Sequence, residues 1–238
     1  MVNLYLRVLM SLIVALDPPV NVDEKKWCVN LIDEIGDVVH GLKFGLPLII
    51  KVGVKGLKDI LSTVNQRSKL LIADLKLADI GYVMALIVKT ITDTGVNTVI
   101  AHAFVGVKGA LEELSEVCRE LNINLVLVAR MSHPGASDVM DKVFDDLLRI
   151  VKMVNAWGAV LPATRPDIIK TGRKFLGPSI KILSPGVGAQ GAKPGEALCA
   201  GADYEIVGRL ITRSKDPLGT ALKVINEQRE RLRSCRGS

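Results

Sequence analysis

Short apolar runs rich in Val, Ile and Leu recur along the chain and alternate with segments of a different periodicity. A continuous apolar run of this length, bounded by polar residues or turns, is typical of a parallel strand buried on both faces. The chain contains eight such runs: Val8–Leu16, Val38–Phe44, Lys69–Ala73, Thr98–Ala101, Leu125–Ala129, Ala159–Pro162, Ile180–Leu183 and Tyr204–Val207.

Segments with the apolar spacing of amphipathic helices lie between these runs. Examples are Glu24–Ile35, Val83–Thr94, Lys108–Leu121, Asp141–Asn155 and Pro217–Arg233. Eight alternations of strand and helix in 238 residues predict an α/β fold, a closed (β/α)₈ TIM barrel rather than an open sheet. No linker or low-complexity stretch interrupts the pattern, so residues 1–238 are predicted to form a single domain.

Polar residues gather where the predicted strands end. In a barrel of this kind the chemistry lies at the carboxyl ends of the strands. The candidates there, in chain order, are Asp17, Lys43, Asp74 with Lys76, His102, Arg130 to His133, Thr164 with Arg165, the turn from Ser184 to Gly191, and Gly208 with Arg209.

Three charges around the third run are the strongest candidates for catalysis. Side chains alternate faces along a strand, so Asp74 and Lys76 are expected on the same side of the strand end. Asp79 follows three residues later, before a predicted turn into a helix at Gly81. Desolvated charges are costly unless they are paired, and two carboxylates around one ammonium hold the lysine protonated. The alternative is a structural salt-bridge cluster, because perturbed charges mark functional sites without proving them.

A glycine-rich turn and a later arginine predict a phosphate site. The segment Pro185–Gly191 follows the seventh run, and Gly208 and Arg209 follow the eighth. Glycines allow the backbone to approach a ligand closely, and loops after strands seven and eight hold phosphate in many barrels. Arg209 adds a bidentate donor suited to phosphate oxygens.

The overall charge agrees with a small anionic ligand. The formal net charge is +6 and the isoelectric point is near 9.2, which favours an anionic partner. Aromatic residues make up only 4%, and the basic residues are dispersed, so no nucleic-acid surface is predicted. The apolar run Val8–Leu16 is too short to span a bilayer, and no membrane association is predicted.

The four cysteines, Cys28, Cys118, Cys199 and Cys235, form no close pair in the sequence. Their spacing suggests neither a disulfide framework nor a zinc site. A reduced, cytoplasmic location is therefore expected.

Taken together, the motifs resemble those of the orotidine 5′-monophosphate decarboxylases, in particular the compact archaeal form. The resemblance runs from the first predicted strand to the eighth. It rests on Asp74-x-Lys76-x-x-Asp79-Ile80 together with Asp17, Lys43-Phe44-Gly45-Leu46-Pro47, Met131-Ser132-His133-Pro134-Gly135, Leu161-Pro162-Ala163-Thr164-Arg165-Pro166, Pro185-Gly186-Val187-Gly188-Ala189-Gln190-Gly191 and Val207-Gly208-Arg209.

The resemblance implies a carboxy-lyase of pyrimidine biosynthesis that converts orotidine 5′-monophosphate (OMP) to UMP and CO₂ as a homodimer, with no cofactor and no metal. It also implies the following roles: Lys76 protonates C6 of the pyrimidine, Asp74 lies beside the substrate carboxylate, and Asp79 and Ile80 enter the partner's site. Lys43 and Asp17 hold the ribose hydroxyls and the charge network, Ser132 the pyrimidine edge, Pro185 the wall of the base pocket, and Gln190, Gly208 and Arg209 the phosphate.

One position departs from the family pattern. The family usually has threonine four residues after the second motif aspartate, and this chain has Val83 there. The substitution puts in doubt one hydroxyl contact across the dimer, and helix packing is the simpler role for Val83.

Two alternatives remain open at this point. A magnesium-dependent sugar-phosphate decarboxylase or aldolase of the same superfamily shares the central motif, but it requires an acidic ligand where this chain has Lys43. A non-catalytic barrel that binds a phosphorylated metabolite is the second, because a fold alone does not establish an activity.

Overall fold

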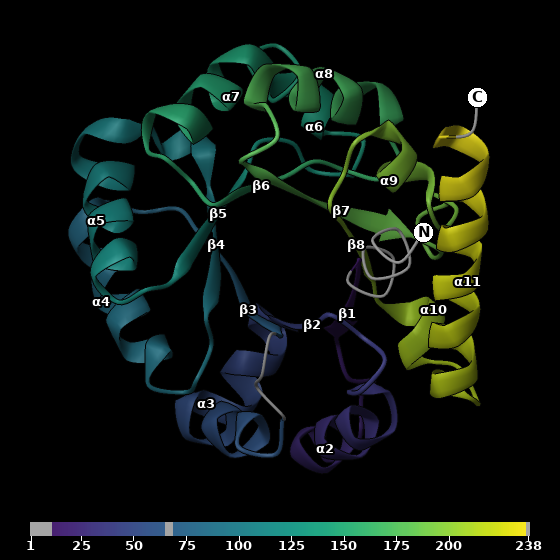
Figure 1. The fold of residues 1–238 in the computed structure, drawn as a ribbon. Helices are drawn as coiled ribbons and strands as arrows, with labels where there is room; N and C mark the ends of the chain where they lie inside the picture. Colours follow the sequence, from purple (N-terminus) through teal and green to yellow (C-terminus); the bar gives the residue numbers. More distant parts are fainter. Residues whose placement is uncertain (1–10, 65–68, 237–238) are drawn as a thin grey trace.

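Eight parallel strands form a closed barrel in the computed structural model, which describes residues 11–64 and 69–236 (Figure 1). Each strand pairs with the next one along the chain, and the eighth pairs with the first. The predicted (β/α)₈ fold is confirmed. The strands are β1 (Leu12–Leu16), β2 (Gly41–Gly45), β3 (Leu70–Leu77), β4 (Thr98–His102), β5 (Asn124–Val128), β6 (Gly158–Val160), β7 (Lys181–Val187) and β8 (Tyr204–Val207).

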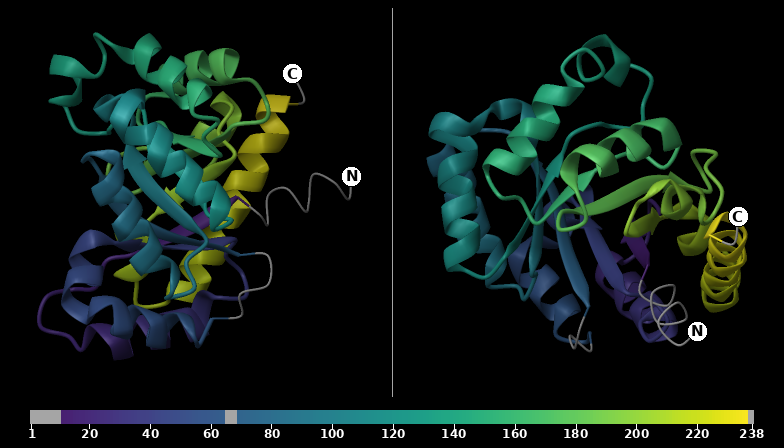
Figure 2. Two further views of the ribbon diagram at one scale, coloured as in Figure 1. Left: turned by 90° about the vertical axis from the view of Figure 1, so that its left-hand side faces the viewer. Right: turned by 45° about the horizontal axis from the view of Figure 1, so that its top comes forward.

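Helices surround the barrel on its outside, as the views along and across its axis show (Figures 1 and 2). None of those in the described ranges is long and apolar enough to cross a membrane. They are α2 (Glu24–Ile35), α3 (Leu46–Leu61), α4 (Gly81–Thr92), η1 (Ala103–Val105), η2 (Val107–Leu111), α5 (Glu112–Glu120), α6 (Ala136–Val139), α7 (Phe144–Met153), α8 (Pro166–Leu176), α9 (Glu196–Ala200), α10 (Arg209–Thr212) and α11 (Pro217–Arg236).

The strands are buried on both faces, which explains their apolar sequences. Every residue of β1, β2 and β4 is buried, because one face packs inside the barrel and the other against helices. Burial of a large aliphatic side chain contributes about 1.5–3 kcal/mol, so this core is the main source of stability. The extent of the domain, residues 1–238, stays a prediction.

Several element boundaries differ from the sequence predictions. The start of the predicted strand Val8–Leu16 lies outside the described residues, and β1 begins at Leu12. The strand predicted at Val38–Phe44 begins only at Gly41. The helix predicted at Lys108–Leu121 is interrupted by Gly109, whose φ of +72° a regular helix does not accommodate, so that α5 begins at Glu112.

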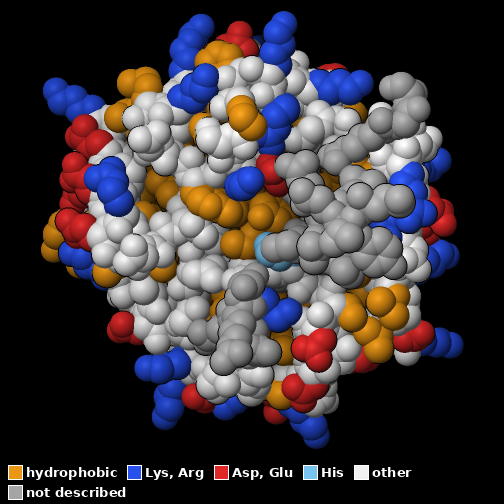
Figure 3. All heavy atoms as spheres, viewed as in Figure 1, with side chains coloured by type: hydrophobic (Ala, Val, Ile, Leu, Met, Phe, Trp, Pro, Cys, Tyr) orange, Lys and Arg blue, Asp and Glu red, His pale blue; other side chains and the backbone are white. Residues whose placement is uncertain are grey.

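Three aromatic rings stack at the amino end of the barrel. Tyr204, the first residue of β8, stacks on His40 with ring centroids 5.1 Å apart. The ring of Trp157 also stacks with that of Tyr204, and their centroids are 6.2 Å apart. Burial lowers the pKa of His40 to about 4, so the ring is neutral at pH 7. Figure 3 looks at this end of the molecule, where apolar side chains gather near the centre.

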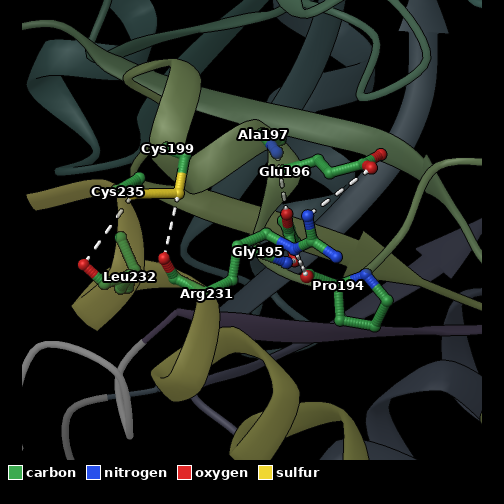
Figure 4. The surroundings of a disulfide bond; sticks show 9 residues. Pro194, Gly195, Glu196, Ala197, Cys199, Arg231, Leu232 and Cys235 are labelled. Atoms are coloured by element: carbon green, nitrogen blue, oxygen red, sulfur yellow. Dashed lines mark hydrogen bonds and ion pairs between the residues drawn. A yellow bond between two sulfur atoms is a disulfide. The ribbon is translucent and has the colours of Figure 1, made fainter. Parts of the chain in front are cut away.

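A disulfide joins Cys199 in α9 to Cys235 in α11 (Figure 4), which corrects the expectation that no disulfide forms. The two cysteines are 36 residues apart in sequence, and only the packing of α11 against α9 brings them together. The spacing of the two cysteines in the sequence therefore did not indicate that they form a disulfide. The disulfide also removes the cysteine-based argument for a reducing compartment. Cys28 and Cys118 are free and buried.

Reducing this disulfide is expected to lower the free energy of unfolding by about 4 kcal/mol, because the unfolded chain regains the freedom of a closed loop. Denaturant unfolding with and without a thiol reductant measures the difference. Burial raises the pKa of the Cys28 and Cys118 thiols to about 12, so neither competes as a reactive thiol. The Cys235→Ser variant is the control and should not respond to the reductant. Equal stability of the oxidised and reduced wild type would contradict the prediction.

Candidate active site

A cavity of about 310 Å³ lies at the carboxyl ends of the strands, a volume at the lower end for small-ligand sites. It brings together residues in or just after the carboxyl-terminal halves of β1, β2, β3, β5, β7 and β8. Nine of the predicted site residues line it: Asp17, Lys43, Asp74, Lys76, Ser132, Pro185, Gln190, Gly208 and Arg209.

Two lysines hold one buried carboxylate on the floor of this cavity. The Nζ of Lys76 lies 2.8 Å from both carboxylate oxygens of Asp74. The Nζ of Lys43, from the neighbouring strand β2, lies 2.9 Å from Oδ2 of the same carboxylate. The side chains of Lys43 and Asp74 are 11% and 8% exposed, whereas that of Lys76 is 43% exposed. Of the three, Lys76 is thus the most accessible to a ligand.

The pKa of the Asp74 carboxyl shows how these charges depend on one another. Burial alone would raise it, because the low-dielectric surroundings disfavour the charged form. Lys43 and Lys76 outweigh that effect, and the pKa lies below its ordinary value of 3.8. At neutral pH Asp74 is therefore ionised, and the cluster carries one negative and two positive charges.

The backbone at Lys76 departs from a regular strand. Its φ is +45°, in the left-handed region that residues other than glycine rarely adopt, and the pairing of β3 with β4 shifts register between Ala73 and Leu77. Asp74 and Lys76 both lie in β3 and meet as predicted from their two-residue separation. Residues in a strained backbone conformation, as at Lys76, cluster at functional sites.

Asp79 and Ile80 do not line the cavity, so one chain does not place two carboxylates around Lys76 as the sequence suggested. The carboxylate of Asp79 accepts a hydrogen bond from the backbone N–H of Ile80 at 2.7 Å, at the start of α4. Ile80 is 60% exposed, although it is a large apolar residue. Both residues lie between the end of β3 at Leu77 and the start of α4 at Gly81.

Asp17 is held at the other edge of the charge cluster by a close approach to β2. A Cβ atom added to Gly45 would lie 2.6 Å from Oδ1 of Asp17, so any larger residue at position 45 would displace this carboxylate. Gly45 is also paired with Asp74 in the register between β2 and β3. The strand pairing thus places Asp17 and Asp74 on the two sides of β2.

The predicted phosphate end of the cavity contains Gln190, Gly208 and Arg209. Gly186, with φ of +117°, allows Gln190 to approach: an added Cβ would lie 3.0 Å from Oε1 of Gln190. The N–H groups of Gly188 and Gly191 donate within the turn, to Ala192 O and Gly188 O, and so do not point to an anion. These two N–H groups are therefore already used within the turn. The side chains of Gln190 and Arg209 remain as donors.

The apolar wall of the cavity was not predicted from the sequence. Each of its members lies within three residues of the carboxyl end of a strand, a position that could have identified it. They are Ile100, Val128, Met131, Val160, Val187 and Ile206. Such a wall lowers the local dielectric around the charges and offers a surface for a flat ring.

His102 and Arg130, which also stand at strand ends, do not line the cavity. His102 is 7% exposed, and burial lowers its pKa, so it is neutral at pH 7. Arg130 is 4% exposed and turns toward the loop that follows β5. No group of three or more His, Cys, Asp and Glu side chains suited to a metal ion occurs within residues 11–64 and 69–236.

This arrangement agrees with a match to a protein-family model. Residues 10–224 match the model described as the orotidine 5′-phosphate decarboxylase / HUMPS family. The chain belongs to this family. An *Aeropyrum pernix* protein named orotidine 5′-phosphate decarboxylase is 45% identical over 218 residues, covering 90% of this chain and 86% of the relative. The protein of the same name from *Pyrococcus furiosus* is 36% identical, covering 92% and 98%.

Solved structures of this family share the fold. The orotidine 5′-monophosphate decarboxylase of *Sulfolobus solfataricus* superposes with a TM-score of 0.81 at 35% identity, covering 93% of this chain and 99% of the other. That of *Methanocaldococcus jannaschii*, complexed with the inhibitor BMP, gives a TM-score of 0.82 at 31% identity, covering 92% and 98%. The resemblance inferred from the motifs is confirmed.

Removal of both cations is expected to raise the pKa of Asp74 above 3.8, because burial then acts unopposed. Carboxyl ¹³C NMR during a pH titration of Lys43→Met/Lys76→Met measures this. In the wild type the folded-state pKa is depressed, so Asp74 contributes stability above pH 3.8 that is lost as the pH falls through the folded pKa. Lys25→Met, which removes the partner of exposed Asp59, is the matched control and should leave Asp74 unchanged. If the pKa of Asp74 is the same in the double variant as in the wild type, the lysines do not set its charge.

Proposed function

We propose that the chain decarboxylates OMP to UMP and CO₂ in pyrimidine biosynthesis. The observation that carries the proposal is the half-exposed Lys76 ammonium, 2.8 Å from a buried carboxylate, in a cavity whose opposite end holds Gln190 and Arg209. The names of the relatives and the BMP complex of one family member support it.

The lining of the cavity supports a division into three subsites. Gln190, Gly208 and Arg209 are proposed to bind the phosphate, since a guanidinium matches phosphate oxygens in bidentate fashion. Asp17 and Lys43 are proposed to hold the ribose hydroxyls. The pyrimidine is then placed against Pro185 and the apolar wall, with the Ser132 hydroxyl at its polar edge.

In the proposed reaction the bond between C6 and the carboxylate breaks, and its electron pair stays on C6 while CO₂ leaves. Lys76 transfers a proton from Nζ to C6, which yields UMP, and the neutral amine is reprotonated from solvent. The carbanion lies in the ring plane, so the π system does not absorb its charge. Stabilisation must therefore come from the protein's own charges.

Repulsion between Asp74 and the substrate carboxylate is a minor part of catalysis. Two unit charges about 4 Å apart interact by about 4 kcal/mol at an effective dielectric of 20. Enzymes commonly lower barriers by about 8–23 kcal/mol. Lys43 and Lys76 already neutralise Asp74, which reduces the repulsion further. The larger contribution is the preorganised Lys76 ammonium, with binding energy from the remote phosphate used to hold the substrate in place.

A homodimer with shared sites is proposed to bring Asp79 and Ile80 to the cavity of the partner. Both lie outside the cavity of their own chain, at the start of α4. Large apolar side chains at this helix are exposed: Ile80 is 60%, Tyr82 62% and Leu86 47% exposed. Clusters of exposed apolar residues mark protein interfaces more often than free surface. A second copy placed here would cover them and add a carboxylate near Lys76.

The magnesium-dependent alternative receives no support from the site. The family description includes HUMPS beside the decarboxylase, so membership alone does not choose between activities. The Nζ of Lys43 lies 2.9 Å from Asp74, and a cation held there would repel Mg²⁺ from that carboxylate. We therefore propose a reaction without metal or cofactor, a small-molecule substrate rather than nucleic acid, and a cytoplasmic location.

Turnover is tested by the fall in ultraviolet absorbance when the protein is mixed with OMP in the presence of a chelator. The wild type is expected to turn over, and Lys76→Ala to lose activity by several orders of magnitude because it removes the proton donor. Binding of UMP by the variant serves as the control for folding. If the wild type were inactive on OMP but active on a sugar phosphate with added Mg²⁺, the proposal would be replaced by the magnesium-dependent alternative.

The shared site is tested with mixed dimers. Asp79→Ala and Lys76→Ala chains are each expected to be nearly inactive, whereas a mixed dimer should regain one intact site from Lys76 of one chain and Asp79 of the other. Activity after the two variants are mixed, unfolded and refolded together measures this. Lack of rescue in chains that are folded and paired would refute the shared site.

A further inference from the structure

The loop after β5 carries two residues of the cavity. Met131 and Ser132 line it directly after the strand, and the chain then passes through α6 before it returns at Asp141. The Ser132 side chain makes no hydrogen bond with any of the described residues. The place of its hydroxyl is therefore set by the backbone that carries it.

Arg130 closes this loop from inside the protein. Its Nε donates to Oδ1 of Asp141 at 2.8 Å, and its Nη2 donates to Oδ2 at 3.1 Å. Its Nη1 donates to the carbonyl oxygen of Met131 at 2.6 Å. The guanidinium thus ties Met131 of the loop to Asp141, the residue at which the loop returns.

The ion pair of Arg130 and Asp141 has a defined geometry, and the burial of Arg130 makes the loss of either partner costly. The Arg130 side chain is 4% exposed, and a bidentate ion pair fixes orientation as well as distance. The hydrogen bond from Arg130 holds the pKa of the Asp141 carboxyl below its usual range, although Asp141 is partly exposed. If one partner were removed, the other would be left without its counterion, with a large cost for a buried group.

The neighbouring loop is attached to the same carboxylate. Nη1 of Arg165, which follows β6, lies 3.6 Å from Oδ2 of Asp141, and Arg165 also pairs with Asp167 at the start of α8. The backbone N–H of Arg130 donates to the carbonyl oxygen of Val160, the last residue of β6, at 3.2 Å. Asp141 is therefore shared by the two loops that flank one side of the cavity.

We propose that Arg130 and Asp141 are a positioning pair for Ser132, so that binding of the pyrimidine edge depends on a guanidinium that touches no ligand. The inference rests on the proposed function, which places the pyrimidine at Ser132. Arg130 acts only through the Met131 carbonyl and the loop. It is thus a positioning residue, not a catalytic one.

A double-mutant cycle tests the coupling, with Ser132→Ala, Asp141→Asn and the two combined. Affinity for UMP, measured by calorimetry, and kcat and KM for OMP, measured separately, are the readouts. Loss of one neutral hydrogen bond is expected to weaken binding about two- to tenfold in Ser132→Ala. Asp141→Asn should weaken binding to a similar degree and act mainly on KM. The combined variant should bind no worse than Ser132→Ala, because Asp141 acts through Ser132.

The control is another partly buried ion pair of arginine and aspartate, at the other end of the barrel. Arg173 pairs with Asp203, before β8, with side chains 23% and 21% exposed. Asp203→Asn should lower stability without changing UMP affinity or KM. If Asp141→Asn does not fold, Arg130→Lys replaces it in the cycle, because it keeps the charge and loses the bidentate fork.

The outcomes separate this inference from the proposed function. If the two substitutions act independently, the factors by which Ser132→Ala and Asp141→Asn weaken UMP binding multiply in the combined variant. That result would overturn the positioning role. An unchanged UMP affinity in Asp141→Asn would overturn it as well. If the wild type binds UMP but does not turn over OMP, the proposed reaction fails while the binding cycle still decides the coupling. A wild type that neither binds UMP nor turns over OMP would overturn both.

Discussion

The carboxylate of Asp74 between the ammonium groups of Lys43 and Lys76 is the interaction on which the candidate site depends. Burial disfavours a charged Asp74, and only the two cations keep it ionised. They reach it because the barrel places β2 beside β3 and pairs Gly45 with Asp74. The same closure desolvates the cluster, so that each charge acts strongly on the others and on a ligand.

Contacts that stabilise the fold lie at the amino end of the barrel, whereas the groups proposed for chemistry lie at the carboxyl end. The amino end holds the stack of His40, Trp157 and Tyr204 and the ion pair of Arg173 with Asp203. Away from the cavity, the disulfide fixes α11 to α9. The carboxyl end holds charged groups that pack less completely, such as the Lys76 ammonium. This division lets loops at one end differ among relatives without loss of the fold.

The cavity is supported by polar contacts as well as by the strands. Asp141 accepts from Arg130 and lies near Arg165, and Gly186 leaves room for Gln190. These contacts fix loops beside the cavity by charge and hydrogen bonding as well as by packing. A ligand with a phosphate at one end and a planar ring at the other would meet groups already in place, which reduces the ordering cost of binding.

The amino-acid sequence by itself determined the fold class and most of the cavity. Eight apolar runs predict eight buried strands, and the carboxyl ends of parallel strands meet in a barrel, so residues as distant as Asp17 and Arg209 were expected in one site. That inference needs only periodicity and connectivity, which are local properties of the chain.

Tertiary structure decided what depends on contacts between distant segments. The left-handed backbone at Lys76 occurs where β3 shifts register against β4. Asp79 lies outside the cavity of its own chain. The disulfide between Cys199 and Cys235 and the pair of Arg130 with Asp141 likewise form only when separate helices and loops pack together. No local sequence pattern indicates such contacts, because their geometry is set by packing across the whole barrel.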